Sequence, residues 1–107
     1  MTAKFSPITG RYVHVTVQGV EYRVYFEEAG KGTPVLMQHT AGTDGRQWRH
    51  ILEDEKLTSQ FRFVAHDLPY HGRSLPPLAM SPLSASSLVH ITNGVELVAR
   101  PRSASVI

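Results

Sequence analysis

The chain has 107 residues, of which 41% are hydrophobic, and its formal net charge is +2. This length fits one domain at most, and the hydrophobic share is that of an ordinary globular protein rather than of a disordered chain. So small an excess of positive charge, without a run of like charges, argues against a nucleic-acid-binding protein.

The sequence contains no cysteine, so disulfides, thiolate catalysis and zinc–thiolate sites are excluded. Residues 1–10 lack the apolar segment of a secretion signal, and no apolar run approaches the ~18–20 residues that a membrane-spanning helix needs. We therefore expect a soluble, cytoplasmic protein with no membrane partner and no cofactor.

Two alternating segments open the chain. Residues 12–17 (YVHVTV) place valine at every second position, and residues 20–26 (VEYRVYF) alternate apolar and polar side chains. Gln18-Gly19 separates them, and a two-residue connection containing glycine between alternating segments is typical of a β-hairpin. We expect two antiparallel strands here.

The following segments predict a strand, a helix and another strand. Residues 35–37 and 61–65 are short apolar segments of the kind found in strands that are covered on both faces. Between them, Asp44 is suited to cap a helix whose apolar stripe is formed by Trp48, Ile51 and Leu52. A hairpin followed by a strand–helix–strand unit predicts an α/β fold with a mixed sheet, and excludes a pure β-sandwich or a helical bundle.

Two motifs in this order resemble those of the α/β-hydrolase family. Residues 34–48 (PVLMQHTAGTDGRQW) are similar to its third strand and the loop after it, which usually reads His-Gly-x-Gly. Residues 67–74 (DLPYHGRS) resemble its Asp-x-Pro-Gly-His-Gly-x-Ser turn after the fourth strand. The resemblance covers residues 10–77 and implies an incomplete fold, the N-terminal portion of an α/β-hydrolase mixed sheet.

The first motif implies an oxyanion-hole loop formed by His39, Thr40, Ala41 and Gly42. A strand that enters a helix through small residues leaves backbone N–H groups free at its carboxyl end, where they stabilise the oxyanion formed in acyl transfer. The resemblance assigns one such donor to this loop, the N–H of Ala41 or that of Thr40. Thr40 replaces the usual glycine, and a β-branched residue resists positive φ, so we expect a different backbone path. A strand-to-helix turn without chemistry is the alternative.

The second motif is expected to be structural, with a framework of Asp67, Pro69, His71, Gly72 and Ser74 that braces the neighbouring loops. Tyr70 replaces the family's usual glycine and either borders a substrate pocket or is simply an exposed loop residue. His66 and His71 lie on either side of a turn that contains proline, without the i, i+4 spacing that presents two ligands on one helix face. No metal site is therefore expected.

No catalytic residue is identifiable, because no serine lies in a Gly-x-Ser-x-Gly nucleophile turn. Ser74 belongs to the second motif, and Ser86 and Ser87 lack flanking glycines. The family's acid and catalytic histidine follow the nucleophile, and His90 is the only histidine after residue 71. We expect a hydrolase of ester or related acyl bonds by descent that is truncated before its nucleophile and inactive as this chain.

Residues 78–107 differ in character from residues 1–77 and do not resemble the family's continuation. They contain few charges and many serines, and Asn93-Gly94 predicts a β-hairpin over residues 88–99. We therefore expect a tail from outside the family, such as the product of an altered reading frame or a retained intron.

A second hypothesis is a small non-catalytic interaction module. The strand at residues 35–37 would have an open edge, which favours self-association through that edge or binding through the hairpin at 88–99. For an intact family member the partner would instead be a small-molecule acyl or ester substrate.

Overall fold

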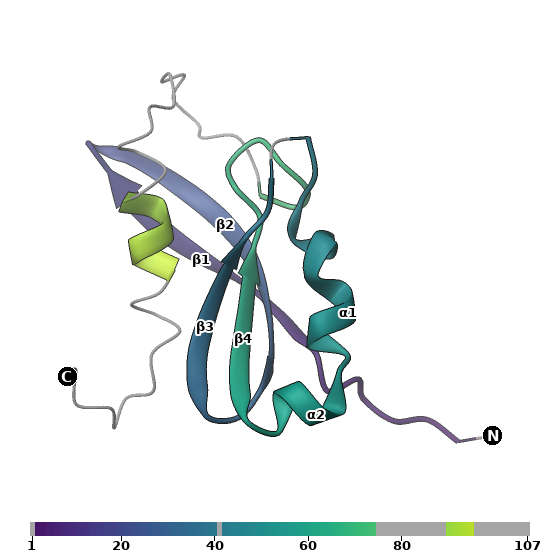
Figure 1. Ribbon diagram of the computed structural model, residues 1–107. Helices are drawn as coiled ribbons and strands as arrows, with labels where there is room; N and C mark the ends of the chain where they lie inside the picture. The colour runs from purple at the N-terminus through teal and green to yellow at the C-terminus, as the bar shows by residue number, and fades with distance from the viewer. Residues whose placement is uncertain (1, 41, 75–89, 96–107) are drawn as a thin grey trace.

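The computed structural model describes residues 2–40, 42–74 and 90–95 (Figure 1). Its strands are β1 (Thr9–Val17), β2 (Val20–Gly30), β3 (Thr33–Gln38) and β4 (Phe61–His66). The helical segments are the 3₁₀ helix η1 (Gly45–Trp48), α1 (Arg49–Leu52), α2 (Glu55–Thr58) and a helix over residues 90–95. None of the described helices is long and apolar enough to cross a membrane.

The strands form one mixed sheet in the order β1-β2-β4-β3. β2 pairs antiparallel with both β1 and β4, whereas β3 and β4 run parallel. Gln18 and Gly19 have φ of 51° and 76°, and two positive φ values in succession suit the turn of a two-residue hairpin. The predicted α/β fold with a hairpin followed by a β-α-β unit is confirmed.

The helix predicted after β3 begins where its cap was expected. The Asp44 side chain accepts a hydrogen bond from the Arg46 N–H at 2.9 Å, and η1 runs directly into α1. Leu52 is fully buried, and Trp48 and Ile51 pack beside it against one face of the sheet. α2 was not predicted, and its cap is Asp54, whose carboxylate accepts from two backbone N–H groups.

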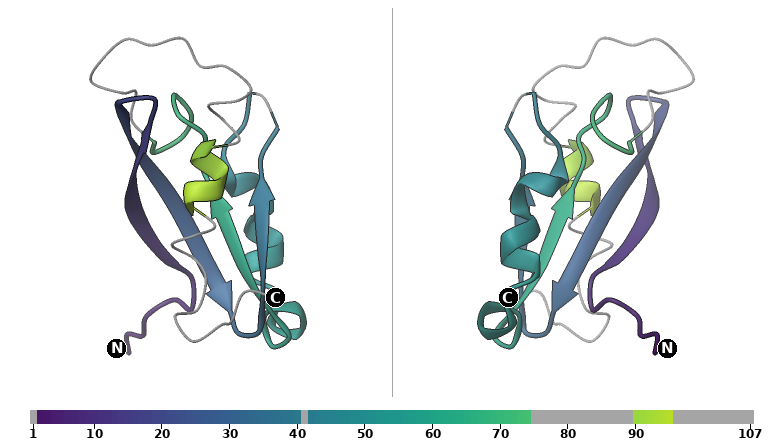
Figure 2. Two further views of the ribbon diagram at one scale, coloured as in Figure 1. Left: turned by 90° about the vertical axis from the view of Figure 1, so that its left-hand side faces the viewer. Right: turned by 90° about the vertical axis from the view of Figure 1, so that its right-hand side faces the viewer.

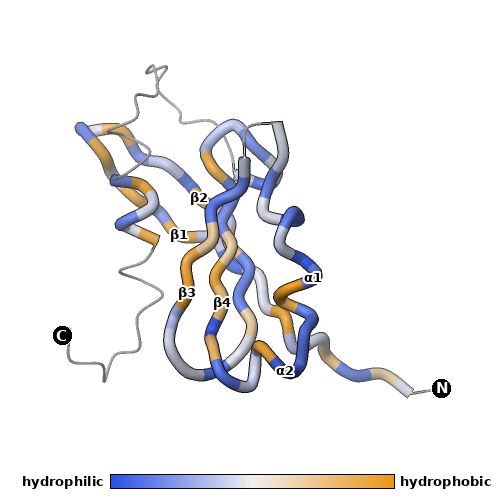
Figure 3. Tube along the Cα trace, viewed as in Figure 1, coloured by the Kyte–Doolittle hydropathy of each residue, from blue (hydrophilic) through white to orange (hydrophobic). Residues whose placement is uncertain are grey.

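Apolar side chains cover both faces of the sheet. Figure 2 shows α1 and α2 on one face and the helix over residues 90–95 on the other. Figure 3 shows hydrophobic residues along β4 and along its neighbour β3 at the edge of the sheet. The cluster under α1 includes Ala29, Met37, Leu52, Phe63 and Ala65. The opposite cluster joins Val17, Tyr22, Val24, Phe26 and Val64 to Ile91 and Val95.

The β-hairpin predicted over residues 88–99 is wrong where the structure describes this segment, because residues 90–95 are helical. Ile91 and Val95 lie four residues apart, so a helix places both on one side, and both are fully buried against the sheet. A Cβ added at Gly94 would lie 2.7 Å from a methyl group of Val15. Gly94 therefore permits close approach of helix and strand, rather than forming a hairpin turn with Asn93.

β3 lies at one edge of the sheet. Within the described residues its hydrogen-bonded neighbour is β4, and its other side carries no strand. Pro34 lies within β3, and proline in a strand is typical of an edge position.

Candidate functional site

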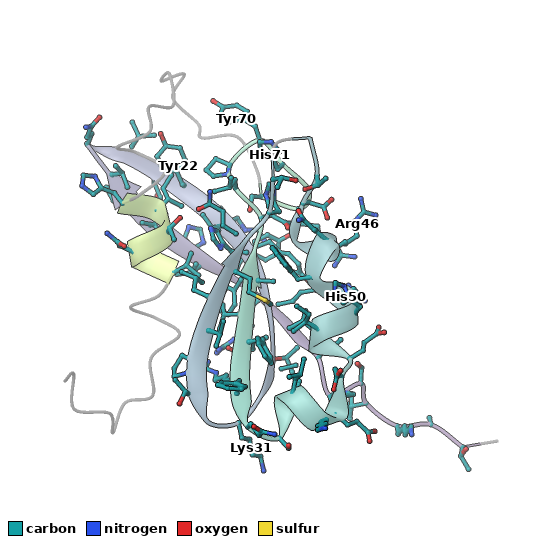
Figure 4. The ribbon with its side chains drawn as sticks, in the orientation of Figure 1. Tyr22, Lys31, Arg46, His50, Tyr70 and His71 are labelled. Atoms are coloured by element: carbon teal, nitrogen blue, oxygen red, sulfur yellow. The ribbon has the colours of Figure 1, made fainter. Side chains whose placement is uncertain are left out.

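The two sequence motifs meet at one end of the sheet. β3 and β4 are parallel and in register, so Gln38 and His66 end side by side. The loop after each strand therefore starts at the same edge, and Figure 4 shows Tyr70 and His71 there. This carboxyl edge is where an open α/β sheet ordinarily binds its ligands.

Asp67 connects the two loops. Its buried carboxylate accepts a hydrogen bond from the Gly45 N–H at 2.6 Å and another from the Arg73 N–H at 2.8 Å. A Cβ added at Gly45 or Gly72 would lie 2.8 Å and 2.3 Å, respectively, from an oxygen of this carboxylate. Both glycines therefore make room for Asp67, which joins the helix after β3 to the turn after β4.

The Ser74 hydroxyl makes structural hydrogen bonds, both as a donor and as an acceptor. It donates to the Asp67 carbonyl at 2.6 Å and accepts from the Tyr25 N–H at 2.9 Å, and the residue is 4% exposed. These bonds attach the end of the second motif to β2. A nucleophilic hydroxyl needs an adjacent base and access to substrate, and Ser74 has neither within the described residues.

His39 and His71 face each other across the two loops, with ring centroids 5.0 Å apart. His39 is buried, and its Nε2 accepts the Leu68 N–H at 3.0 Å, so its hydrogen lies on Nδ1, 2.9 Å from the Thr40 carbonyl. His71 Nδ1 lies 2.9 Å from the Pro69 carbonyl. Both rings are therefore held by backbone atoms of the loops that they connect.

Gln47, which sequence reasoning missed, holds the loop that was predicted to form an oxyanion hole. Its side-chain oxygen accepts from the Thr40 N–H at 2.9 Å, the Thr40 hydroxyl at 3.2 Å and the Thr43 hydroxyl at 3.0 Å. Among the described residues of the loop, Gly42 takes the left-handed conformation, with φ of 84°. Thr40 avoids positive φ, and its N–H is already bound to Gln47, while Ala41 lies outside the described residues.

Tyr70 occupies a conformation that favours glycine. The His71 N–H bonds to the Leu68 carbonyl at 2.9 Å across Pro69 and Tyr70, and φ of Tyr70 is 67°. Proline followed by a residue of positive φ is the pattern of a type II turn, whose third position prefers glycine. Tyr70 is 47% exposed and lines an open groove of about 670 Å³ between the loops, together with Gly42, Thr43, Gln47, His71 and Gly72.

A smaller cavity of about 240 Å³ lies between β2, α1 and the second motif. Its charges are largely paired: Arg49 bonds Glu27 at 2.9 Å, and Arg46 bonds Asp44 at 2.9 Å. The hydrogen bond from the Arg46 side chain lowers the pKa of Asp44, so this carboxylate remains ionised as the helix cap. Because each of these charges is neutralised by its partner, the two ion pairs favour neither an anionic nor a cationic ligand in this cavity.

His66, the last residue of β4, is completely buried. Burial is the main cause that lowers its pKa to about 4, so the ring is neutral near pH 7. Its Nε2 lies 3.4 Å from the Thr92 hydroxyl on the helix over residues 90–95, and its Nδ1 has no hydrogen-bond partner in the part of the chain that the structure describes. Within the described residues, no group of three His, Asp or Glu side chains could hold a metal ion.

No protein-family profile and no curated protein matches the chain. Solved structures do match. The epoxide hydrolase VrEH1 from Vigna radiata is 26% identical with a TM-score of 0.69, over 87% of this chain and 29% of its own. An epoxide hydrolase from an endophytic Streptomyces is 28% identical with a TM-score of 0.69, over 85% and 26%. The Cif epoxide hydrolase from Acinetobacter nosocomialis is 22% identical with a TM-score of 0.67, over 91% and 28%.

The chain spans less than a third of the length of each of these proteins. Residues 1–77 are 77 of 107 residues, or 72% of the chain, so matches over 85–91% of it extend beyond residue 77. The structural likeness therefore reaches further along the chain than the two motifs do. With its leading hairpin, its parallel β3–β4 pair and its order β1-β2-β4-β3, the chain has the fold of the N-terminal portion of the α/β-hydrolase family.

Proposed function

We propose that the chain provides the oxyanion-loop side of an α/β-hydrolase active site and has no hydrolytic activity by itself. The observation that supports this is the connection of the two motif loops by Asp67, which fixes the loop after β3 relative to the turn after β4. Electrostatic catalysis depends on donors that are held in place before the reaction. A nucleophile on a different strand would complete such a site, and none of the chain's serines lies in a suitable turn.

Ala41 is the proposed oxyanion donor. The other candidate, the Thr40 N–H, is bound to Gln47, so it is not free to stabilise a developing charge. We propose that Gln47 fixes this loop by holding Thr40 and Thr43 on either side of the proposed donor.

For a site that a nucleophile completes, the proposed reaction is hydrolysis, and two substrate classes have to be distinguished. The family resemblance favours ester or related acyl bonds, whereas the matching structures are named epoxide hydrolases. The fold alone does not decide between them, since one scaffold supports several chemistries.

Hydrolysis of p-nitrophenyl acetate and of styrene oxide by the purified chain tests the proposal. The expected rate equals that of buffer plus an inert protein of similar size at the same concentration. Saturable turnover that survives repeated purification and is lost in Ser74→Ala would overturn it, provided that circular dichroism shows the variant to be folded.

The second candidate function is self-association through β3. It is supported by the position of β3 at the edge of the described sheet, where backbone groups on one side face no other strand. The partner proposed is a second copy of the chain, paired edge to edge.

Sedimentation velocity at several concentrations tests self-association. Thr33→Lys adds a charge at an exposed position of β3, and Val35→Lys adds one at a half-buried position. Dimers should weaken in both variants and persist in His50→Lys, which changes an exposed residue of α1. A monomer at all concentrations, or dimers that none of these changes affects, would remove this candidate. We also propose a cytoplasmic location, which cell fractionation would test.

A further inference from the structure

Tyr70 poses a physical problem, because its backbone conformation is one that a tyrosine resists. Its φ of 67° lies in the left-handed region, where the Cβ of an L-residue crowds the backbone. The type II turn formed by residues 68–71 favours glycine at this position. Glycine would therefore relieve the strain, and the presence of tyrosine needs another explanation.

Packing does not supply that explanation. Tyr70 is 47% exposed, and no hydrogen bond, ring contact or ion pair of its side chain is found among the described residues. The turn itself is held by other groups: the His71 N–H bonds to the Leu68 carbonyl, and the Arg73 N–H bonds to Asp67. Within the described part of the fold, the tyrosine ring thus adds little stability while straining its backbone. Strain retained in this way often accompanies function.

The position of Tyr70 indicates what the ring can do. It borders the groove of about 670 Å³ between the two motif loops, which Gly42 and Thr43 line from the loop after β3. Figure 4 shows Tyr70 projecting from the carboxyl edge of the sheet beside His71. Tyr70 and His71 are the two aromatic residues that line the groove, whereas Gly42 and Gly72 contribute no side chain to its wall.

We propose that Tyr70 determines ligand specificity by forming an aromatic wall of this groove, and that the groove accepts a neutral aromatic group attached to a carbonyl or a similar polar centre. An aromatic ring beside Tyr70 would gain offset or edge-to-face contact, and the polar centre would lie near the loop that carries Gly42. Arg46 and Asp44, which also border the groove, neutralise each other, so a charged ligand gains little. This inference rests on the proposed function, because it assigns the groove to the hydrolase site.

Acetophenone and cyclohexyl methyl ketone are the probes, since they share a carbonyl, cannot be hydrolysed and differ in aromaticity. Each is titrated into the ¹⁵N-labelled chain, and amide shifts are followed by NMR. Acetophenone should shift the amides of Gly42, Thr43 and Gly72 saturably. The cyclohexyl ketone should bind about 3- to 10-fold more weakly, as expected when one aromatic contact is lost.

Variants separate this role from a structural one. Tyr70→Phe should bind acetophenone within about twofold of the unchanged chain, because the ring is retained. Tyr70→Gly should lose about 3- to 10-fold in affinity while its Tm stays level or rises, because the strain is relieved. Tyr12→Phe, at an exposed tyrosine on β1, is the matched control and should change nothing.

Equal binding of the two ketones, equal binding by Tyr70→Gly, or no shift at the groove amides up to the solubility limit would each overturn the inference. A Tm loss in Tyr70→Gly would show that the ring stabilises the fold, and would overturn the argument from strain. These results leave the hydrolase proposal intact. Turnover by the chain alone would instead contradict that proposal without affecting the assignment of Tyr70.

Discussion

Replacement of Asp67 by asparagine should destabilise the chain far more than its small change in shape suggests. The carboxylate accepts from Gly45 N–H at 2.6 Å and from Arg73 N–H at 2.8 Å, and the residue is only 5% exposed. An asparagine keeps one acceptor oxygen and places an NH₂ group against the other N–H. One charge-assisted bond is lost, the other becomes neutral, and a buried donor is left without an acceptor.

The size of the effect follows from these losses. Hydrogen bonds to charged groups contribute about 1.5–3 kcal/mol, and a buried donor without a partner costs about 1–3 kcal/mol. Allowing for partial relaxation, Asp67→Asn should lower the free energy of unfolding by about 2–4 kcal/mol. Asp54 supplies a matched control, because its carboxylate also accepts from two backbone N–H groups, at 3.0 and 3.1 Å, but is exposed. Asparagine is as good a helix cap as aspartate, so Asp54→Asn should cost less than about 0.5 kcal/mol.

Urea unfolding followed by circular dichroism measures both variants, and amide exchange at Gly45 and Arg73 locates the effect. Exchange of both amides should accelerate in Asp67→Asn and not in Asp54→Asn. Equal losses of stability in the two variants, or unchanged exchange at Gly45 and Arg73, would refute the assignment of Asp67 as the connection between the loops.

Three further predictions concern other parts of the structure. His66 has a folded pKa of about 4, below its ordinary 6.5, so its neutral form contributes stability that is complete above pH 6.5 and lost as the pH falls from 6.5 to 4. Urea titrations should show that the free energy of unfolding falls by about 2–4 kcal/mol over this pH interval, and by less in His66→Gln. Asn93→Ala should stabilise the chain by up to about 0.5 kcal/mol, because alanine favours a helix, whereas a hairpin turn would be weakened. Gln47→Leu should accelerate exchange of the Thr40 amide about 5- to 10-fold, and Gln47→Glu, which retains the acceptor, should not.

A different result would contradict each of these three predictions. An equal pH dependence in His66→Gln would assign the acid sensitivity to other groups. Destabilisation by Asn93→Ala would contradict the helix over residues 90–95. Slow exchange at Thr40 in Gln47→Leu would show that the Gln47 side chain does not hold this amide.

Local signals in the sequence were sufficient for much of the fold. The turn at Gln18-Gly19 and the cap at Asp44 each involve atoms only a few residues apart, so residue type alone indicates the structure. The same applies to the stripe that begins at Trp48, whose spacing follows from helix geometry. These parts were predicted because tertiary contacts reinforce what the local sequence already prefers.

The helix over residues 90–95 could not be predicted in this way. Asn93-Gly94 favours a turn locally, but burial of Ile91 and Val95 against the sheet outweighs that preference. The burial that lowers the pKa of His66 also depends on tertiary contacts, among them Thr92 of this helix, whose hydroxyl lies 3.4 Å from the ring Nε2. To predict either feature, one would have to know which face of the sheet this helix covers.

In the candidate site, the motif residues were predictable and their connections were not. Asp67 and Gly45 are 22 residues apart in sequence, so their hydrogen bond exists only once β3 and β4 lie in parallel register. Gln47 lies within the first motif, but its role depends on the three donors that the folded loop presents to it. The positive φ at Tyr70 could have been anticipated, since proline before a position that usually holds glycine indicates a type II turn.

We propose that the chain contributes an oxyanion loop without a serine nucleophile. Incubation with a fluorophosphonate, followed by intact mass spectrometry and peptide mapping, tests it most directly, because a serine activated for acyl transfer would be phosphonylated. We expect an unchanged mass under conditions that label an active serine hydrolase completely. Stoichiometric addition of one phosphonyl group to the folded chain, mapped to Ser74 or to any other serine, would contradict it.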